Sequence, residues 1–398
     1  MNEKRVLLVT KNLLDMSDAQ SQQSFALVNA LCDSGYYLDI VTADSRTGQL
    51  DGVKIPQNAR LFALPASWHS DGKSLIRKIH RKLYRSLVSI IQSKWSLNAA
   101  RRISKLSATN DYSAVISIAL PMESHLAVLN AKVRPRQWIA CMSDPWPESI
   151  LPKPYSDFSI PFLSHAQKKV VGDILQSADH LVFTCRDQLD FMKKYYQSVS
   201  ESKSSIIPHI APGILEGSQK RTGEFVISHC GSLSRERVCL SLASALSRLP
   251  EQSAVVINFI GNVNDEMRHA FERSGASSRV RYTGLLAKEE AMKKSSEGNA
   301  LLLIEAEMEE YPFLPSKLAD YSSITLPILA ITGKQSPSAK LISESNGGIV
   351  CGHDSDSILN ALTSIEKSSL QVSPQLNSHF SPDGVVKNYN EIILNSHT

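Results

Sequence analysis

Residues Asn299 to Ile331 read NALLLIEAEMEEYPFLPSKLADYSSITLPILAI and contain the pattern that decides the fold. The apolar run from Ala300 to Ile304 is short and is followed by charge, as expected for a buried strand of a parallel sheet. Pro315 suits the first turn of a helix, where its missing N–H costs nothing. The stretch therefore predicts a strand, a loop, a helix and, from Pro327 to Ile331, a second strand.

The helix that begins near Pro315 has the features of an anion site. The amides of Ser316, Lys317 and Leu318 are expected to be free at its N-terminus, where the helix dipole favours negative charge. Lys317 adds a full positive charge there. Asp320 lies about one turn later on the same side and can accept hydrogen bonds from a sugar diol. The alternative is an ordinary helix start with a solvated Lys and Asp.

Residues 224 to 243, EFVISHCGSLSRERVCLSLA, repeat this arrangement. An apolar strand leads through a Gly-Ser turn into a helix that is expected to open with Arg235 and Arg237. Gly231 permits a tight turn and the close approach of a ligand, and an arginine fork can hold a diphosphate. Because the helix dipole prefers acids at this end, the basic first turn favours a second phosphate site over a chance arrangement.

These two motifs, in this order, resemble those of the retaining glycosyltransferases with the GT-B fold, and in particular of glycosyltransferase family 4. The resemblance covers nearly the whole chain. It implies an α/β architecture of two Rossmann-like domains facing a cleft, with a nucleotide sugar as donor. The first family motif is matched by Gly231, Leu233 and Arg237, and the Pro-Ser-Lys helix start with its following turn by Pro315, Ser316, Lys317, Asp320, Tyr321 and Pro327.

The resemblance also implies a role for each matching residue. Arg237, Ser316 and Lys317 would hold the nucleotide diphosphate, and Asp320, in place of the more usual Glu, would bind the ribose hydroxyls. The remaining residues expected at the donor site are Gly231, Arg235, Leu318 and Glu310. Glu310 is included because Pro312 stands where the family often has a Glu that contacts the donor sugar, so that Glu310 or Glu309 would have to replace it.

Residues 138 to 149, WIACMSDPWPES, predict a strand and a stiff loop at its carboxyl end, where open α/β sheets bind ligands. Similar Asp-x-Trp-Pro loops occur in bacterial polysaccharide glycosyltransferases, although Ser143 stands where many family members have a functional His. The resemblance implies that Asp144 is catalytic, orienting the acceptor hydroxyl or the reacting sugar, and that Trp146 stacks on the acceptor. Alternatively, Asp144 caps the next turn and Trp146 fills the core.

The N-terminal half supports the same architecture, because it opens with an apolar strand, a helix from Ala19 to Leu31 and a second strand. Asp18 and Ala19 stand where family members commonly have a glycine pair. We expect an N-terminal acceptor-binding domain at 1–205, a linker at 206–223 and a nucleotide-sugar-binding domain at 224–380. A C-terminal helix at 381–398 would, as often in this fold, cross back to the first domain.

The segment 72–106 is strongly basic and has apolar residues at helical spacing, followed one turn later by Trp95. This pattern predicts an amphipathic helix that docks on an anionic membrane, near a polyprenyl-linked acceptor. The alternative is a helix packed on the N-terminal sheet with a solvated basic face. No acid interrupts its ten basic residues, Lys73, Arg77, Lys78, Arg81, Lys82, Arg85, Lys94, Arg101, Arg102 and Lys105.

Composition is that of a globular protein, with 398 residues, 42% hydrophobic residues and a net charge of +4. The absence of a leader-like start or a spanning run predicts a cytoplasmic protein, peripheral on the inner membrane. No nucleic-acid-binding motif accompanies the basic segment. The six cysteines lack metal-ligand spacing, and Asp354 and Asp356 precede a helical pattern as capping residues would, so no metal or other cofactor is expected.

These observations favour a retaining glycosyltransferase that moves a sugar from a nucleotide sugar to a glycan or lipid-linked acceptor in bacterial surface polysaccharide synthesis, such as a capsule or O-antigen. Two alternatives stay open. The departures at Pro312, Ser143 and the missing glycine pair are also those of a degenerate GT-B protein that scaffolds a polysaccharide-assembly complex. An epimerase or phosphorylase of the same fold would differ in reaction but not in architecture.

Overall fold

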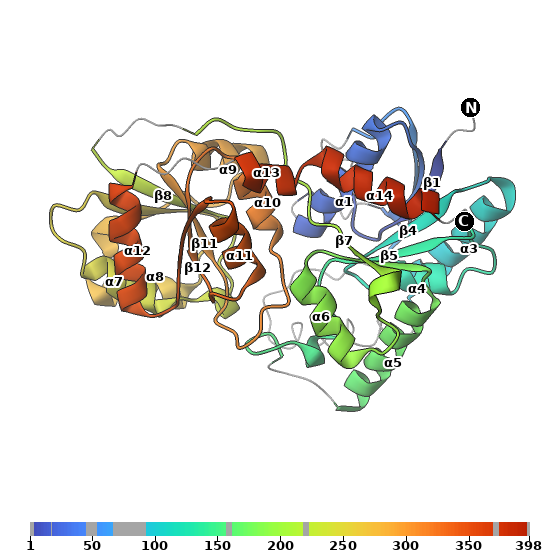
Figure 1. The fold of residues 1–398 in the computed structure, drawn as a ribbon, viewed down its shortest axis with the longest axis horizontal. Coiled ribbons are helices and arrows are strands. Elements are labelled where there is room, and N and C mark those ends of the chain that lie inside the picture. Colours follow the sequence, from blue (N-terminus) through green and yellow to red (C-terminus); the bar gives the residue numbers. More distant parts are fainter. Residues whose placement is uncertain are drawn as a thin grey trace. The chain divides into compact units, whose positions relative to one another are not determined.

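The computed structural model describes residues 4–16, 18–44, 54–66, 93–156, 161–217, 223–368 and 374–395. The chain divides into two compact units. Unit 1 comprises Met1–Leu151, Ser156–His209 and Pro382–Thr398, and unit 2 comprises Pro152–Tyr155 and Ile210–Ser381. Each unit has one parallel sheet with helices on both faces (Figure 1), so the expected α/β architecture with two Rossmann-like sheets is confirmed.

Unit 1 is built on a seven-stranded sheet in the order β3-β2-β1-β4-β5-β6-β7. Every strand pairing in it is parallel. The central strands are fully buried, which explains why they read as continuous apolar runs. The strands are β1 (Arg5–Val9), β2 (Tyr37–Ala43), β3 (Ala59–Leu64), β4 (Ala114–Ala119), β5 (Trp138–Met142), β6 (His180–Phe183) and β7 (Ser204–Ile206).

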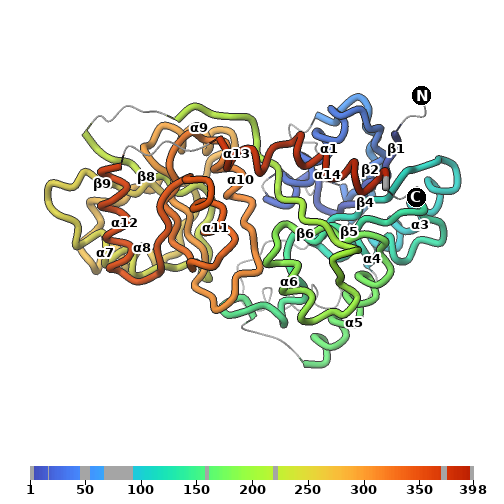
Figure 2. The backbone as a smooth tube through the Cα atoms, viewed as in Figure 1, coloured from blue at the N-terminus to red at the C-terminus, as the bar shows by residue number. Residues whose placement is uncertain are grey.

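The helices of unit 1 cover both faces of this sheet. On one face α3 packs against α4 and α4 against α5, whereas α1 packs against the C-terminal helix α14. Figure 2 shows the red C-terminal tube beside the blue α1. The helices are α1 (Ala19–Asp33), α3 (Lys94–Thr109), α4 (Glu123–Leu129), α5 (Pro161–Ser177), α6 (Arg186–Tyr195) and α14 (Pro382–Asn395), with 3-10 turns at Glu148–Ile150 and Glu201–Lys203.

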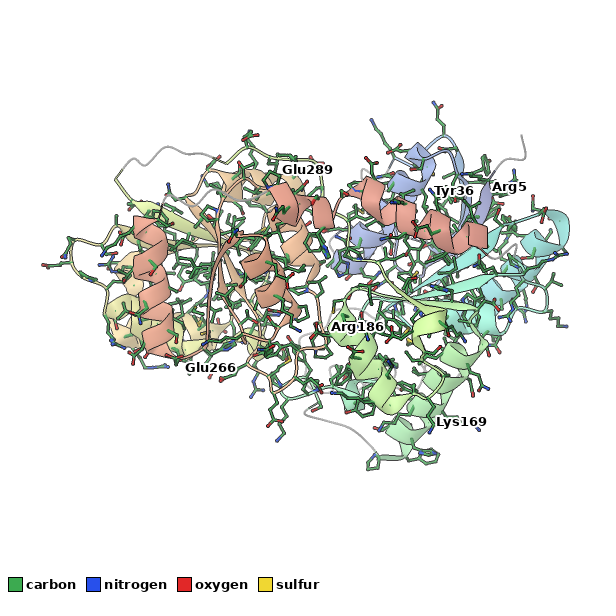
Figure 3. The ribbon with its side chains drawn as sticks, in the orientation of Figure 1. Arg5, Tyr36, Lys169, Arg186, Glu266 and Glu289 are labelled. Atoms are coloured by element: carbon green, nitrogen blue, oxygen red, sulfur yellow. The ribbon has the colours of Figure 1, made fainter. Side chains whose placement is uncertain are left out.

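Helix α14 belongs to unit 1 because it covers apolar surface of β5 and α1. Its buried residues Val385, Val386, Tyr389, Ile392 and Ile393 follow a helical period. Hydrogen bonds fix its position as well: the Gln137 amide donates to the Ile392 carbonyl at 2.9 Å, and the Cys141 thiol lies 3.2 Å from the Tyr389 hydroxyl. Tyr36, labelled in Figure 3, donates its hydroxyl hydrogen bond to Asn390.

Unit 2 is built on a six-stranded parallel sheet in the order β10-β9-β8-β11-β12-β13. Its strands are β8 (Phe225–Cys230), β9 (Val255–Ile260), β10 (Val280–Tyr282), β11 (Ala300–Ile304), β12 (Ile328–Ile331) and β13 (Gly348–Cys351). The strand expected from Ala300 to Ile304 has those bounds, and the one expected from Pro327 begins one residue later. The quoted stretch therefore contains two neighbouring strands of this sheet.

In unit 2, α7, α8 and α12 pack on one face of the sheet and α9, α10 and α11 on the other, as Figure 1 shows. Helix α10 follows β11 and contacts it. The helices are α7 (Leu240–Ser247), α8 (Asp265–Ser274), α9 (Lys288–Ser296), α10 (Ser316–Ser322), α11 (Pro337–Glu344), α12 (Ser355–Lys367) and α13 (Pro374–His379), with 3-10 turns at Arg235–Arg237 and Ser277–Arg279.

Most of the basic segment 72–106 lies outside the described residues, and only its last part is seen. There, α3 begins after Ser93 and buries Trp95, Ala99, Ile103 and Leu106 in the core of unit 1. The apolar side of this part is thus covered by protein, as in the packed-helix alternative, and membrane docking stays a prediction for the segment as a whole. Among the helices that the structure describes, none is long and apolar enough to span a membrane.

A buried ion pair lies at the centre of unit 1. Lys11 follows β1 and Glu123 begins α4 after β4, and their Nζ and Oε2 atoms are 2.7 Å apart. The exposed side-chain fractions are 11% and 7%, so both charges are largely withdrawn from water. Such a pair adds little net stability, but removing one partner leaves a charge buried without it.

We expect Glu123→Leu to destabilise unit 1 by about 3 kcal/mol, because the Lys11 ammonium loses its carboxylate in a dry site. The double variant Lys11→Met with Glu123→Leu should recover most of this loss. Equilibrium unfolding in urea, followed by circular dichroism, measures both. Glu201→Ala, which removes a surface pairing with Arg186, is the control and should leave the midpoint nearly unchanged. A double variant as unstable as the single one would contradict this account.

Candidate functional site

The candidate site of unit 2 lies where the strand order reverses. β8 leads to β9 and β10 on one side, and its other neighbour β11 leads to β12 and β13 on the opposite side. The crevice at the carboxyl ends of two such strands is the usual ligand site of an open α/β sheet. Both sequence motifs meet here, because Gly231 directly follows β8 and α10 follows β11.

The hydroxyl of Tyr321 separates β8 from β11 at this end. The ladder between them is formed at Ile227 and Ser228, and its register would next join the Cys230 N–H to the Leu302 carbonyl. Instead, the Cys230 N–H donates to the Tyr321 hydroxyl at 2.8 Å, and that hydroxyl donates to the Leu302 carbonyl at 3.1 Å. The side chain thus satisfies both backbone groups while it holds the strands apart.

Two glycines bring the backbones of β8 and β9 together beside this opening. Gly231 has φ +99° and donates its N–H to the Ile260 carbonyl at 2.7 Å. Gly261 has φ +139°, and a Cβ placed on it would lie 2.6 Å from the Gly231 carbonyl carbon. A Cβ on Gly231 would lie 3.4 Å from Lys317 Nζ. The absence of side chains therefore brings bare backbone next to the Lys317 ammonium.

Lys317 contacts His229, a residue that the sequence analysis did not select. Its Nζ lies 3.1 Å from Nε2 of His229, a fully buried residue of β8. The other ring nitrogen, Nδ1, is 3.0 Å from the Leu302 carbonyl, which can only accept. Nδ1 therefore carries the proton, and Nε2 accepts from Lys317. Burial, and next the charge of Lys317, hold the pKa of His229 well below its usual value, so the imidazole is neutral.

Electrostatics make Lys317 an unusual lysine. Burial, together with the positive charge of Arg237, lowers its pKa from 10.5 to about 7. Near neutral pH the side chain of Lys317 is therefore in part ammonium and in part neutral amine. An anion bound beside Lys317 and Arg237 would stabilise the charged form of the lysine and offset the repulsion between the two cations.

The structure corrects two details of the expected phosphate cradles. Arg235 and Arg237 lie in a 3-10 turn, and the helix that follows begins only at Leu240, so these arginines do not open it. The Leu318 amide is not free, because it donates to the Pro315 carbonyl at 2.9 Å. Short turns of this kind satisfy local amides that a longer helix would leave open.

Asp320 is already engaged in the structure. Its Oδ1 lies 2.8 Å from Nζ of Lys288, the first residue of α9. Burial raises the pKa of the Asp320 carboxyl, and the charge of Lys288 opposes that shift. Asp320 lies one turn after Lys317 on α10, as expected from the spacing, but the sequence gave no sign of its lysine partner.

Glu305 is a buried acid that the sequence analysis did not select. It directly follows β11, is 7% exposed and accepts from the Thr332 hydroxyl at 2.6 Å. Burial raises the pKa of Glu305, and the charge of Arg237 opposes the shift. An acid at the carboxyl end of a buried parallel strand was the available signal. Glu310 is half-buried in the β11–α10 loop, and Pro312 is buried there.

In unit 1 the Asp-Pro-Trp-Pro loop follows β5. Asp144 is half-buried, and the amide of the preceding residue, Ser143, donates to the Ala119 carbonyl at 3.3 Å. Trp146 is partly buried against the core, and its backbone carbonyl accepts from the Tyr196 hydroxyl at 3.1 Å. The indole thus contributes to the core, as in the alternative interpretation, and its stacking on an acceptor stays a prediction.

Two aspartates singled out in the sequence cap helices, and for Asp354 this was the expected role. Asp18 caps α1 by accepting from the Ser21 amide at 3.2 Å. Asp354 caps α12 by accepting from the Ser357 amide at 2.8 Å, which confirms its capping role. Within the described ranges, no group of three or more His, Cys, Asp or Glu side chains is arranged to hold a metal ion.

Several solved structures are similar to the chain. Sucrose-phosphate synthase from Thermosynechococcus elongatus is 14% identical, with 99% of each chain covered and a TM-score of 0.66. Anabaena HepE in complex with UDP and glucose is 12% identical, with 98% of this chain and 100% of that chain covered and a TM-score of 0.67. The lipopolysaccharide outer core galactosyltransferase WaaB is 12% identical, with 98% and 99% covered and a TM-score of 0.62.

No protein-family model and no curated protein sequence matches the chain. The structural likeness nevertheless extends through both units and through the whole length of each neighbour. At these identities it is a likeness of fold. The chain therefore has the GT-B glycosyltransferase fold seen in members of glycosyltransferase family 4.

Proposed function

We propose that the chain is a nucleotide-sugar-dependent glycosyltransferase whose donor site is the crevice between β8 and β11. The observation that carries the proposal is the position of Lys317, a cation held against a neutral histidine beside the bare backbone of Gly231. Such a site suits a diphosphate, which needs positive charge and close backbone approach. HepE, a structural neighbour, was solved with UDP and glucose.

The chemistry follows from the charges. When the bond between sugar and diphosphate breaks, negative charge grows on the leaving diphosphate and positive charge on the sugar. Lys317 and Arg237 are fixed in advance and can stabilise the leaving group without reorganising, which is the usual basis of electrostatic catalysis. Asp320 would accept from the ribose, and Asp144 of unit 1 would orient the acceptor hydroxyl. Retention of configuration rests on the family resemblance.

The acceptor belongs to the same proposal at a coarser level. We infer a glycan or polyprenyl-linked acceptor of a bacterial surface polysaccharide, and this is supported by neighbours such as the lipopolysaccharide galactosyltransferase WaaB. A site at the inner membrane would place the enzyme beside such an acceptor, with segment 72–106 as the proposed contact. Product analysis with and without acceptor separates transfer from epimerase or phosphorylase chemistry.

Titration calorimetry with UDP, GDP, ADP and CMP tests the donor site. We expect selective binding of one nucleotide, weakened roughly 10- to 100-fold by Lys317→Ala and by Arg237→Ala, because each removes a charge-assisted contact with phosphate. Lys294→Ala and Arg248→Ala are the controls. Lys294 and Arg248 are exposed and pair with the surface acids Glu297 and Asp356.

Three results would contradict the proposal. Binding that neither Lys317→Ala nor Arg237→Ala weakens would place the nucleotide elsewhere. Absence of binding to all four nucleotides would favour the degenerate scaffold, and a protein that binds its nucleotide but turns over no donor would favour it as well. Hydrolysis of the matching nucleotide sugar provides the turnover assay.

The low pKa of Lys317 predicts a pH dependence. Its folded-state pKa of about 7 means that the ligand-free lysine loses its proton as the pH rises above 7. A bound diphosphate favours the protonated form, so binding should take up a proton and the affinity should fall as the pH is raised. Above about pH 7.5 the phosphate is itself fully ionised and does not mask the trend.

Calorimetry in buffers of different ionisation enthalpy measures this proton uptake. We expect uptake of a substantial fraction of one proton near pH 8 for the wild type and none for Lys317→Ala, the matched control. Equal proton uptake by both proteins would show that another group titrates. Besides burial, the charges that shift the pKa of Lys317 are those of Arg237, Cys230 and Asp320, and Nε2 of His229 lies 3.1 Å from its Nζ.

The close approach of the two glycines predicts the effect of a single methyl group. Gly261→Ala should weaken nucleotide binding, because its Cβ displaces the Gly231 backbone. It should also cost roughly 1–2 kcal/mol for the left-handed conformation. Gly275→Ala is the control, with φ +78° and no neighbouring atom within 4 Å. It should keep full binding and lose less stability in urea unfolding than Gly261→Ala, whose Cβ also meets backbone. Wild-type binding by Gly261→Ala would rule out the close-approach argument.

A further inference from the structure

The ion pair between Lys288 and Asp320 is less exposed than three other ion pairs of unit 2. Its side chains are 30% and 17% exposed. In contrast, the side chains of three surface pairs are 47% to 75% exposed. Those three pairs are Arg248–Asp356, Arg281–Glu224 and Lys294–Glu297. Lys288 and Asp320 are therefore partly withdrawn from water, which makes their charges costly and their interactions strong.

The pair lies beside the phosphate-binding lysine. Asp320 is one turn after Lys317 on α10, and Lys288 begins α9 on the same face of the sheet. Burial raises the pKa of the Cys230 thiol at the end of β8; the charges of Lys317 and Lys288 oppose this shift, whereas that of Asp320 adds to it. The pair thus lies at the edge of the proposed donor site.

Holding α9 and α10 in place does not require this pair. Helix α9 buries Ala291 and Met292, and α10 buries Leu318, Ala319 and Tyr321. Apolar residues would join two helices at a smaller desolvation cost than a half-buried ion pair. The value of the pair is therefore chemical: it presents a carboxylate acceptor and an ammonium donor 2.8 Å apart.

A vicinal diol matches this arrangement, because each hydroxyl both donates and accepts a hydrogen bond. We propose that Lys288 and Asp320 together recognise the ribose hydroxyls of the donor nucleotide, and that Lys288 sets a preference for ribonucleotides over 2′-deoxyribonucleotides. The inference rests on the proposed donor site and adds Lys288 to it as a specificity residue. A nucleotide without the 2′-hydroxyl would leave Lys288 and Asp320 with fewer hydrogen bonds in a site that is partly withdrawn from water, which lowers its affinity.

The test is a cycle of two changes, Lys288→Met and removal of the 2′-hydroxyl, measured by calorimetry. The ligands are the nucleoside diphosphate that the wild type binds and its 2′-deoxy form. We expect the wild type to prefer the ribonucleotide by roughly 10- to 100-fold. In Lys288→Met this ratio should fall at least about 5-fold, through weaker ribonucleotide binding with little change for the deoxynucleotide.

Lys294→Met is the matched control, since Lys294 lies on the same helix and pairs with exposed Glu297. It should keep the wild-type ratio. Repeating the measurement on Lys288→Met at about pH 8.5, which favours the ionised form of the Asp320 carboxyl, separates a lost contact from a protonated Asp320. A ratio that stays low at this pH supports recognition by Lys288. A restored ratio would mean that Lys288 only keeps its partner charged, and would overturn the inference.

The remaining outcomes are also decisive. A wild type that binds both nucleotides equally, or a Lys288→Met variant that weakens both to the same extent, would overturn the inference while leaving the donor site intact. A wild type that binds no nucleoside diphosphate would instead refute the proposed function, and this site with it.

Discussion

The site of unit 2 depends on one phenol that keeps two parallel strands from closing. If β8 and β11 continued their ladder, the Cys230 amide and the Leu302 carbonyl would bond directly and the sheet would be shut at its carboxyl end. The Tyr321 hydroxyl stands between them and satisfies both. Because Tyr321 lies on the same short helix as Lys317, the side chain that opens the sheet also fixes the cation that faces the opening.

A common principle relates the two units. In each, a lysine lies where the strand order reverses: Lys11 between β1 and β4, and Lys317 between β8 and β11. Their partners differ. Glu123 neutralises Lys11 within unit 1, whereas the neutral imidazole of His229 leaves the charge of Lys317 uncompensated by that contact. Burial and the charge of Arg237 lower the pKa of Lys317 to about 7, and a bound anion would offset that repulsion.

Much of the fold could be predicted because buried parallel strands read as short apolar runs, as at Ala300–Ile304. Lys317 and Asp320 could be predicted as neighbours because helical spacing fixes their relation. Contacts between segments that are distant in the sequence could not be predicted. His229 reads as one polar residue in an apolar strand, and Lys288 as one of many surface lysines, until α9 and α10 pack on the same sheet face. The 3-10 turn at Arg235–Arg237 could not be predicted either, because the path of the loop between β8 and α7 is not determined by local propensity.

The charged residues of the proposed donor site differ in how far they are withdrawn from water and compensated. Burial lowers the pKa of Lys317 to about 7. Lys288, in contrast, is paired with the Asp320 carboxylate at 2.8 Å. A diphosphate would therefore gain most next to Lys317, whose Nζ lies against the neutral imidazole of His229. A neutral diol would gain most next to the ion pair, which presents a donor and an acceptor side by side. In the proposed donor site, this difference in charge would orient a nucleotide with its phosphates toward Gly231 and its ribose toward α9.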